Sequence, residues 1–139
     1  MATNFLLRCE VIEECYEFML GYAGQGLPSD QHNGARSQIR EFLERSVQQL
    51  TGLAESCDES LQQSGMGKSD LQDFVAVLRR DAQDSLAAIQ LVLAQPSISS
   101  QLIDNLNAST HLRALLTDLF LAGDILRTRT NTAISSAAE

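Results

Sequence analysis

Apolar side chains recur at every third or fourth position along almost the whole chain, and this periodicity is the strongest constraint on its fold. Residues 39–61 show the pattern most clearly. No segment combines alternating apolar and polar residues with β-branched enrichment, the pattern that predicts a strand. The two prolines, Pro28 and Pro96, lie between periodic segments and not inside them. The sequence therefore predicts an all-α protein.

Turns divide the periodic residues into four segments. The longest turn, residues 24–34, contains three glycines and one proline. Ser69 and Gln72 have the spacing of a capping box, which predicts that the third helix begins at this serine. Pro96 ends that helix, because the residue before a proline avoids the helical region. We expect helices over residues 4–23, 35–63 and 69–94, followed by a last helical segment over 98–130.

The last segment has two alternative forms. Residues 107–110 (Asn-Ala-Ser-Thr) offer a break, with Ser109 or Thr110 capping the following helix. In that form residues 98–106 make a short extra helix that caps one end of the protein. After Arg127 the chain is small and polar, so we expect residues 131–139 to fray. The whole pattern predicts an antiparallel four-helix bundle, with residues 1–130 as its single domain.

Charge and composition exclude several classes of protein. Asp and Glu total 18 against 10 Lys and Arg, which gives a net charge of −8. General binding to nucleic acid or to anionic membranes needs cations that face phosphate, so neither is expected. No apolar run approaches the roughly 20 residues of a membrane span. Three cysteines are too few for a disulfide scaffold, so we expect a soluble cytoplasmic protein.

The first helix has an apolar arc that covers well over half of its circumference at about 100° per residue. Arg8 is the one cation in this arc. An ordinary surface helix buries a narrower stripe, so this helix either lies centrally or also packs against another chain. Val77 and Leu121 likewise lie off the main apolar stripes of their helices. The remaining arc of the first helix is filled by Glu10, Glu13, Glu14 and Glu17.

Extra apolar surface on a domain usually marks a partner site or a homodimer contact. We therefore expect a small interaction module, such as an adaptor, a regulator, or an assembly or export chaperone. It would bind helical protein partners or a second copy of itself. An amphipathic partner helix would lie along the first helix, whose acids select basic residues. The predicted partner-binding residues are Glu10, Glu13, Glu14, Glu17, Val11 and Phe18.

A ligand-binding sensor bundle is the second hypothesis. Its pocket would lie in the interior near the 24–34 loop. Buried tyrosine hydroxyls need hydrogen-bond partners, and a ligand supplies one in this hypothesis. The predicted pocket residues are Tyr16, Met19, Tyr22, His32 and His111.

Enzymatic and metal-binding signatures are not apparent in the sequence. No Ser/His/Asp or Cys/His arrangement has a recognisable context, and the Glu-x-x-His pairs of di-iron bundles are missing. In an antiparallel hairpin Cys15 and Cys57 would lie about 20 Å apart along the axis. We expect buried, inert cysteines, no catalytic residues, no metal and no cofactor. A helical-bundle enzyme of unspecified chemistry is the remaining alternative.

Overall fold

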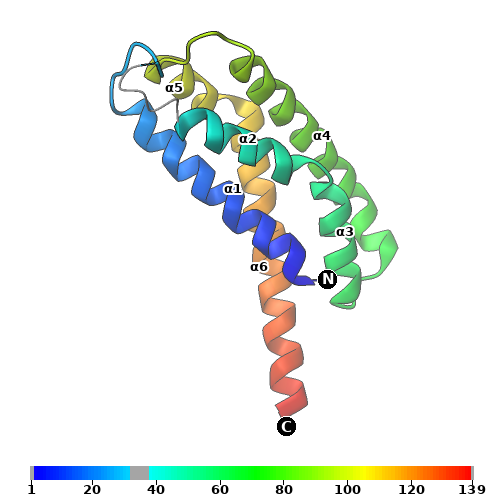
Figure 1. Cartoon of the computed structure of the whole chain (residues 1–139). Coiled ribbons are helices and arrows are strands. Elements are labelled where there is room, and N and C mark those ends of the chain that lie inside the picture. Colours follow the sequence, from blue (N-terminus) through cyan, green and yellow to red (C-terminus); the bar gives the residue numbers. More distant parts are fainter. Residues whose placement is uncertain (1, 32–37, 139) are drawn as a thin grey trace.

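The computed structural model describes residues 2–31 and 38–138, with side chains described for 4–31 and 38–131. Within these residues helix is the only regular secondary structure, which confirms the all-α prediction (Figure 1). The six helices described are α1 (Ala2–Ala23), α2 (Gln38–Leu50), α3 (Leu53–Gln63), α4 (Lys68–Leu93), α5 (Ser100–Ala108) and α6 (Thr110–Ala138).

Helix α1 lies centrally, in contact with α2, α3, α5 and α6. This position explains its wide apolar arc, because neighbours cover it on several sides, and it confirms the first of the two expectations for this helix. A bilayer crossing needs a longer apolar stretch than any helix of the described residues offers. The side chains that α1 buries recur every three or four residues and are Phe5, Cys9, Ile12, Cys15, Met19 and Tyr22.

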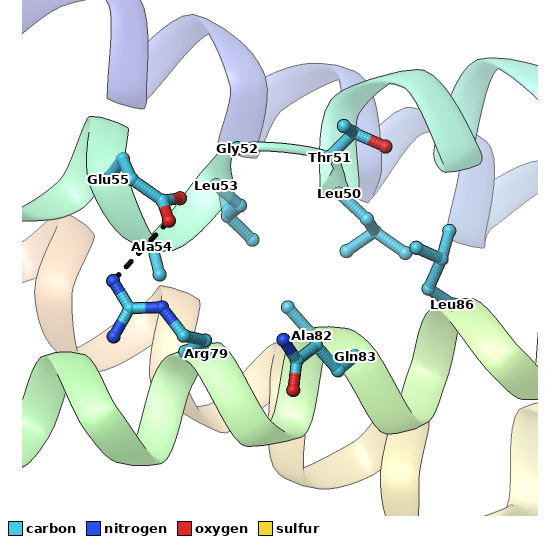
Figure 2. A pocket seen from close by; sticks show the side chains of 10 residues that line it. All are labelled: Leu50, Thr51, Gly52, Leu53, Ala54, Glu55, Arg79, Ala82, Gln83 and Leu86. Atoms are coloured by element: carbon cyan, nitrogen blue, oxygen red, sulfur yellow. Dashed lines mark hydrogen bonds and ion pairs between the residues drawn. The ribbon is translucent and has the colours of Figure 1, made fainter.

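The prediction of one continuous helix over residues 35–63 is wrong. Helix α2 ends at Leu50 and α3 begins at Leu53, and the chain passes between them through Thr51 and Gly52 (Figure 2). Gly52 has a φ of 78°, a left-handed conformation that a residue with a Cβ atom adopts at a cost. The glycine therefore ends α2 in the way that a helix C-terminal glycine commonly does. Residues 35–37 lie outside the described residues.

Arg8 holds this break from the neighbouring helix α1. Its Nη1 atom donates hydrogen bonds to the carbonyl oxygens of Gln49 at 2.9 Å and Thr51 at 2.8 Å. The last carbonyls of a helix have no intrahelical donors and carry a partial negative charge, so a guanidinium stabilises them. The one cation in the apolar arc of α1 thus serves as a cap for the end of α2.

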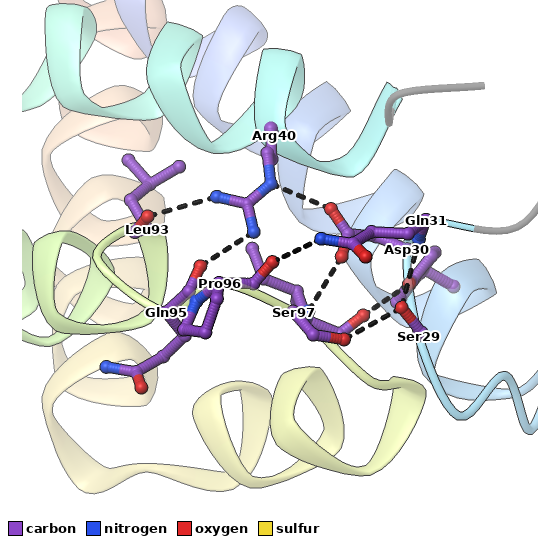
Figure 3. Close-up of polar contacts among 10 residues, drawn as sticks. Ser29, Asp30, Gln31, Arg40, Leu93, Gln95, Pro96 and Ser97 are labelled. Atoms are coloured by element: carbon purple, nitrogen blue, oxygen red, sulfur yellow. Dashed lines mark hydrogen bonds and ion pairs between the residues drawn. The ribbon is translucent and has the colours of Figure 1, made fainter. Parts of the chain in front are cut away.

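A second arginine, together with its partner Asp30, joins four segments at the other end of α2 (Figure 3). Arg40 pairs through Nε with the Oδ2 atom of Asp30 at 2.7 Å. It also donates hydrogen bonds to the carbonyls of Leu93 at 3.1 Å and Gln95 at 2.7 Å, at the end of α4. The other Asp30 oxygen accepts a hydrogen bond from the backbone N–H of Ile98 at 2.8 Å. The loop after α1 is therefore tied to α2, to α4 and to the segment before α5.

Helix α4 begins at Lys68, and Gly67 occupies its N-cap position without a side-chain hydrogen bond. The predicted capping box is therefore wrong, because Ser69 already lies in the first helical turn. Gly65, with a φ of 103°, reverses the chain within a few residues of α3, so α4 starts before this serine. The other end of α4 agrees with the prediction, since the helix stops at Leu93, shortly before Pro96.

The last segment is two helices, which decides between its two alternative forms. Ser99 caps α5, and its Oγ accepts a hydrogen bond from the Leu102 N–H at 3.0 Å. Ser109 separates α5 from α6 and accepts one from the Leu112 N–H at 3.3 Å, as the sequence predicts. Helix α6 continues to Ala138, beyond the expected end at residue 130, and its last turns extend past the other helices (Figure 1). Fraying of residues 131–139 stays a prediction.

Candidate functional site

The exposed face of α1 carries three of the four predicted acids. Glu10, Glu14 and Glu17 are exposed and follow one another by four and three residues, so they share one side of the helix. We call these three residues the acidic strip. Leu7, 58% exposed, and Leu20, 48% exposed, lie beyond its two ends. The fourth acid, Glu13, is half-buried and does not belong to the exposed strip.

The two apolar residues of the predicted partner site are only partly available at the surface. Val11 and Phe18 are both half-buried. The ring of Phe18 stacks on Phe42 of α2, with ring centroids 4.1 Å apart and planes 11° from parallel. The Arg45 guanidinium lies 5.0 Å from the centroid of Phe42. Much of the Phe18 surface is therefore buried in the contact between α1 and α2.

The same edge of α1 and α2 carries an exposed ion pair. Nη2 of Arg45 lies 3.5 Å from Oε2 of Glu14, and both side chains are more than a third exposed. Exposed pairs of this kind contribute about 0.2–1 kcal/mol. Glu14 can thus exchange Arg45 for a cation of a partner at little cost in free energy.

The predicted interior pocket corresponds to a very small void. Tyr16 and Met19 line a cavity of about 10 Å³, together with Ser46 and apolar side chains of several helices. Such a volume is at the lower limit for a single water molecule. Tyr22 lies elsewhere, and its hydroxyl donates a hydrogen bond to the Ile98 carbonyl at 2.6 Å. This tyrosine therefore needs no ligand to satisfy its hydroxyl.

The structure describes one of the two histidines of the predicted pocket. His111 is exposed at the start of α6, and its Nδ1 atom lies 3.9 Å from Oδ2 of Asp84. Its backbone carbonyl accepts a hydrogen bond from the Ser85 hydroxyl at 3.0 Å. His32 lies outside the described residues. A ligand-binding role for these residues stays a prediction.

A hollow that the sequence analysis did not predict lies at the break between α2 and α3 (Figure 2). Its volume of about 210 Å³ is below the roughly 300–1,000 Å³ of typical ligand pockets. An ion pair between Arg79 and Glu55, 3.4 Å from Nη2 to Oε1, crosses its rim. The only sequence signal for it was Gly52 inside a periodic segment. The hollow is lined by Leu50, Thr51, Gly52, Leu53, Ala54, Glu55, Arg79, Ala82, Gln83 and Leu86.

The three cysteines are buried and unpaired, which confirms the prediction that they are buried. Burial raises the pKa of the Cys9 and Cys57 thiols to about 12, and it also raises the pKa of Cys15. Thiols with such pKa values are weak nucleophiles at neutral pH. Among the described residues, no group of three or more His, Cys, Asp or Glu side chains has the arrangement of a metal site.

A buried carboxyl group that sequence reasoning missed lies between α4 and α6. Asp118 of α6 is only 7% exposed, and its enclosed Oδ2 atom has no formed hydrogen bond among the described residues. Burial, then hydrogen bonding and charge repulsion from Asp81 of α4, raise the pKa of Asp118 from 3.8 to about 7. The sequence held no signal for this pair, because α4 and α6 had to be placed side by side first.

Large apolar side chains are also exposed away from α1. Val77 and Leu121, which lie off the stripes of their helices, are both exposed, as that position implies. Phe120, Leu121 and Ile125 lie within six residues of one another on α6. This stretch is the densest group of large exposed apolar side chains in the described part of the chain. Leu91 near the end of α4 is exposed as well.

Comparison with protein-family models, with curated proteins and with solved structures finds no match to this chain. Its function is therefore inferred from its own residues.

Proposed function

We propose that this protein is an interaction module that binds a basic amphipathic helix of a partner protein along α1. The acidic strip, with an exposed leucine beyond each end, is the observation that carries this function. Glu10 and Glu17 are seven positions apart, so the acidic strip extends over about 10 Å of helix. A partner helix with Lys or Arg at matching positions would pair with all three carboxylates at once.

The two leucines extend this surface. Leu7 and Leu20 are thirteen positions apart in sequence, which corresponds to about 20 Å along α1. An apolar side chain near each end of the partner helix would cover them, while the central cations meet the acids. Apolar contacts then supply most of the affinity, and charge selects the partner and its orientation. The half-buried Val11 and Phe18 would form the floor of this contact.

A peptide-binding experiment tests this function. The probe is an 18-residue helical peptide with Lys at three positions spaced by four and three residues and Leu at both ends, labelled for fluorescence anisotropy. We expect binding that weakens with added salt, because exposed charge pairs are screened. A peptide of the same composition with scrambled order should bind at least about tenfold more weakly, a difference of about 1.4 kcal/mol.

Charge reversal on the protein provides the matched control. Glu10→Lys with Glu17→Lys should abolish the preference for the ordered peptide without changing the helical content. Asp73→Lys with Asp104→Lys changes the net charge equally at exposed positions on α4 and α5. This control should keep the preference. Equal loss in both double variants would show a general charge effect and would contradict a site on α1.

Self-association is a second candidate, favoured by the three exposed apolar residues of α6. A two-fold contact brings the same patch of both copies together, so Phe120, Leu121 and Ile125 would cover one another. Phe120→Ser with Leu121→Ser should then convert a dimer into a monomer in native mass spectrometry. A wild-type monomer at all concentrations up to the millimolar range would exclude this contact.

The remaining parts of the proposal concern location and architecture. Buried, unpaired cysteines fit a reducing compartment, so the cytoplasm is the proposed location. The six described helices fit a four-helix bundle in which α2 and α3 make one broken arm and α5 caps an end. No enzymatic activity is proposed.

A further inference from the structure

Helices α4 and α6 run antiparallel, and their contact brings two carboxyl groups together. The hydrogen bond from the Ser85 hydroxyl to the His111 carbonyl and the contact of Asp84 with His111 mark one end of this contact. Further along, Asp118 of α6 is buried, with no hydrogen bond to its Oδ2 atom among the described residues, and Asp81 of α4 is the charged group that raises its pKa. The chain numbers fall on α4 as they rise on α6, so Asp81 and Asp118 both lie on the same side of the contact at His111, toward the start of α4 and the end of α6.

We propose that the carboxyl groups of Asp81 and Asp118 make the contact between α4 and α6 sensitive to pH. The contact is tight while the pair shares a proton, and it loosens when both groups are ionised. Two like charges held together away from water repel strongly, whereas one proton between two carboxyls supplies a hydrogen bond. This inference does not depend on the proposed binding of a partner along α1.

Among the described residues, no cation shifts the pKa of Asp118. Only burial and Asp81 shift its pKa, and both raise it. From α3 the Cys57 thiol faces the carboxyl, and its own pKa is raised to about 12 by burial first and then by charges that include Asp118. Cys9 of α1 lies beyond Cys57, and its pKa is also about 12, so both thiols are neutral at physiological pH.

The remaining charged groups of the helices around α6 have other partners or lie in solvent. On α6 itself, His111 lies seven residues before Asp118 and faces Asp84 of α4. Arg127 of α6 lowers the pKa of the Cys9 thiol, and Glu13 of α1 raises it. Asp104 of α5 is exposed. Within the described residues the pair of aspartates therefore faces itself, with two neutral thiols nearby.

The direction of the pH effect follows from the raised pKa of Asp118. In the open or unfolded state this group ionises near pH 3.8, whereas in the closed state it keeps its proton until about pH 7. The contact is therefore most stable below about pH 4, loses stability as the pH rises from there to about 7, and loses no more above that. Between pH 6 and pH 8 the opening equilibrium should rise about tenfold.

The contact between α4 and α6 also borders an exposed apolar surface. Val77 lies one turn from Asp81, and Leu121 lies one turn from Asp118, so the antiparallel register brings them to the same part of the interface. Both are exposed in the closed state. Opening of the contact would add the buried side chains of Leu78 and Leu119, which lie on the inner faces of the two helices, to this surface.

Hydrogen exchange of the full chain, measured by mass spectrometry, tests whether the contact between α4 and α6 depends on pH. In the wild type, the opening equilibrium constant obtained from peptides of α4 and α6 should be about tenfold larger at pH 8 than at pH 6, after correction for intrinsic exchange rates. Asp118→Asn should remove this difference, because an amide does not ionise. The control Asp124→Asn changes an exposed acid of the same helix and should behave as wild type.

Two further variants distinguish the carboxyl pair from His111 as the origin of the pH effect. Asp81→Asn leaves Asp118 facing a neutral amide and should reduce the pH difference even if Asp118→Asn does not fold. His111→Gln removes the other titratable contact between the helices. The opening equilibrium of this variant should differ between pH 6 and pH 8 as it does in the wild type. An unchanged opening equilibrium in the wild type, or a difference that persists in Asp81→Asn and disappears in His111→Gln, would overturn the proposal.

Discussion

Arg40 and Asp30 meet at 2.7 Å, between the guanidinium Nε and the carboxylate Oδ2, at a point where the Asp30 side chain is almost fully buried. The pair joins the loop after α1 to the first turns of α2. Through its other nitrogens Arg40 also holds two carbonyl oxygens at the end of α4. One guanidinium therefore fixes how the loop after α1, the start of α2 and the end of α4 meet.

Replacement of this arginine tests how much that contact contributes. Arg40→Met should lower the free energy of unfolding by about 3 kcal/mol, because the Asp30 carboxylate would remain buried without its counter-ion. Urea denaturation followed by circular dichroism measures the change. The control Arg45→Met removes an exposed cation of the same helix and should cost about 0.5 kcal/mol or less. Equal effects of the two variants would contradict a special role for the buried pair.

Two glycines should respond to alanine with opposite signs. Gly52 has a φ of 78°, so Gly52→Ala should lower the free energy of unfolding by about 1–2 kcal/mol through backbone strain. Gly21 is exposed within α1, and apart from its neighbours in the helix backbone a Cβ atom there would meet no described atom within 4 Å. Gly21→Ala should therefore stabilise the protein by about 0.5–1 kcal/mol. Thermal unfolding of both variants checks the signs. An alanine at position 52 without loss of stability would contradict the left-handed break and favour the continuous helix predicted from sequence.

The hydroxyl of Tyr22 should matter more than that of Tyr16. Tyr22→Phe leaves the buried Ile98 carbonyl without its 2.6 Å donor and should cost about 1–2 kcal/mol of unfolding free energy. Tyr16→Phe keeps the ring, and its hydroxyl forms no hydrogen bond within the described residues, so this variant should change stability by less than about 0.5 kcal/mol. A larger cost at position 16 would point to a polar group or a bound molecule beside that hydroxyl.

The three thiols should be protected from alkylation in the native protein. Burial raises the pKa of all three, to about 12 for Cys9 and Cys57, so very little thiolate is present at pH 8. Iodoacetamide should label the folded protein slowly and the urea-unfolded protein at all three sites, as intact mass spectrometry would show. Rapid labelling of one native thiol would identify an accessible cysteine and contradict the buried position described for it.

Local sequence signals were sufficient for the helical class, for the approximate extent of most helices and for the wide apolar arc of α1. They also indicated the exposed acids at positions 10, 14 and 17, because one arc of a helix is defined by periodicity alone. They failed at Ser69, where a nearby glycine turn competes with a capping serine. They also failed at Gly52, which periodicity treated as an interior residue although a left-handed glycine ends a helix.

Contacts between distant segments required the folded chain. Nothing near Arg8, Arg40 or Asp118 in sequence indicates that the first caps α2, the second pairs with Asp30, or the third faces Asp81. Periodicity defines which side of a helix is buried, and it carries no information about which helix lies opposite or in what register. The sequence alone therefore determined the helices and their buried faces. The packing of those faces determined the ion pair, the helix caps and the carboxyl pair, because each depends on atoms brought together across an interface.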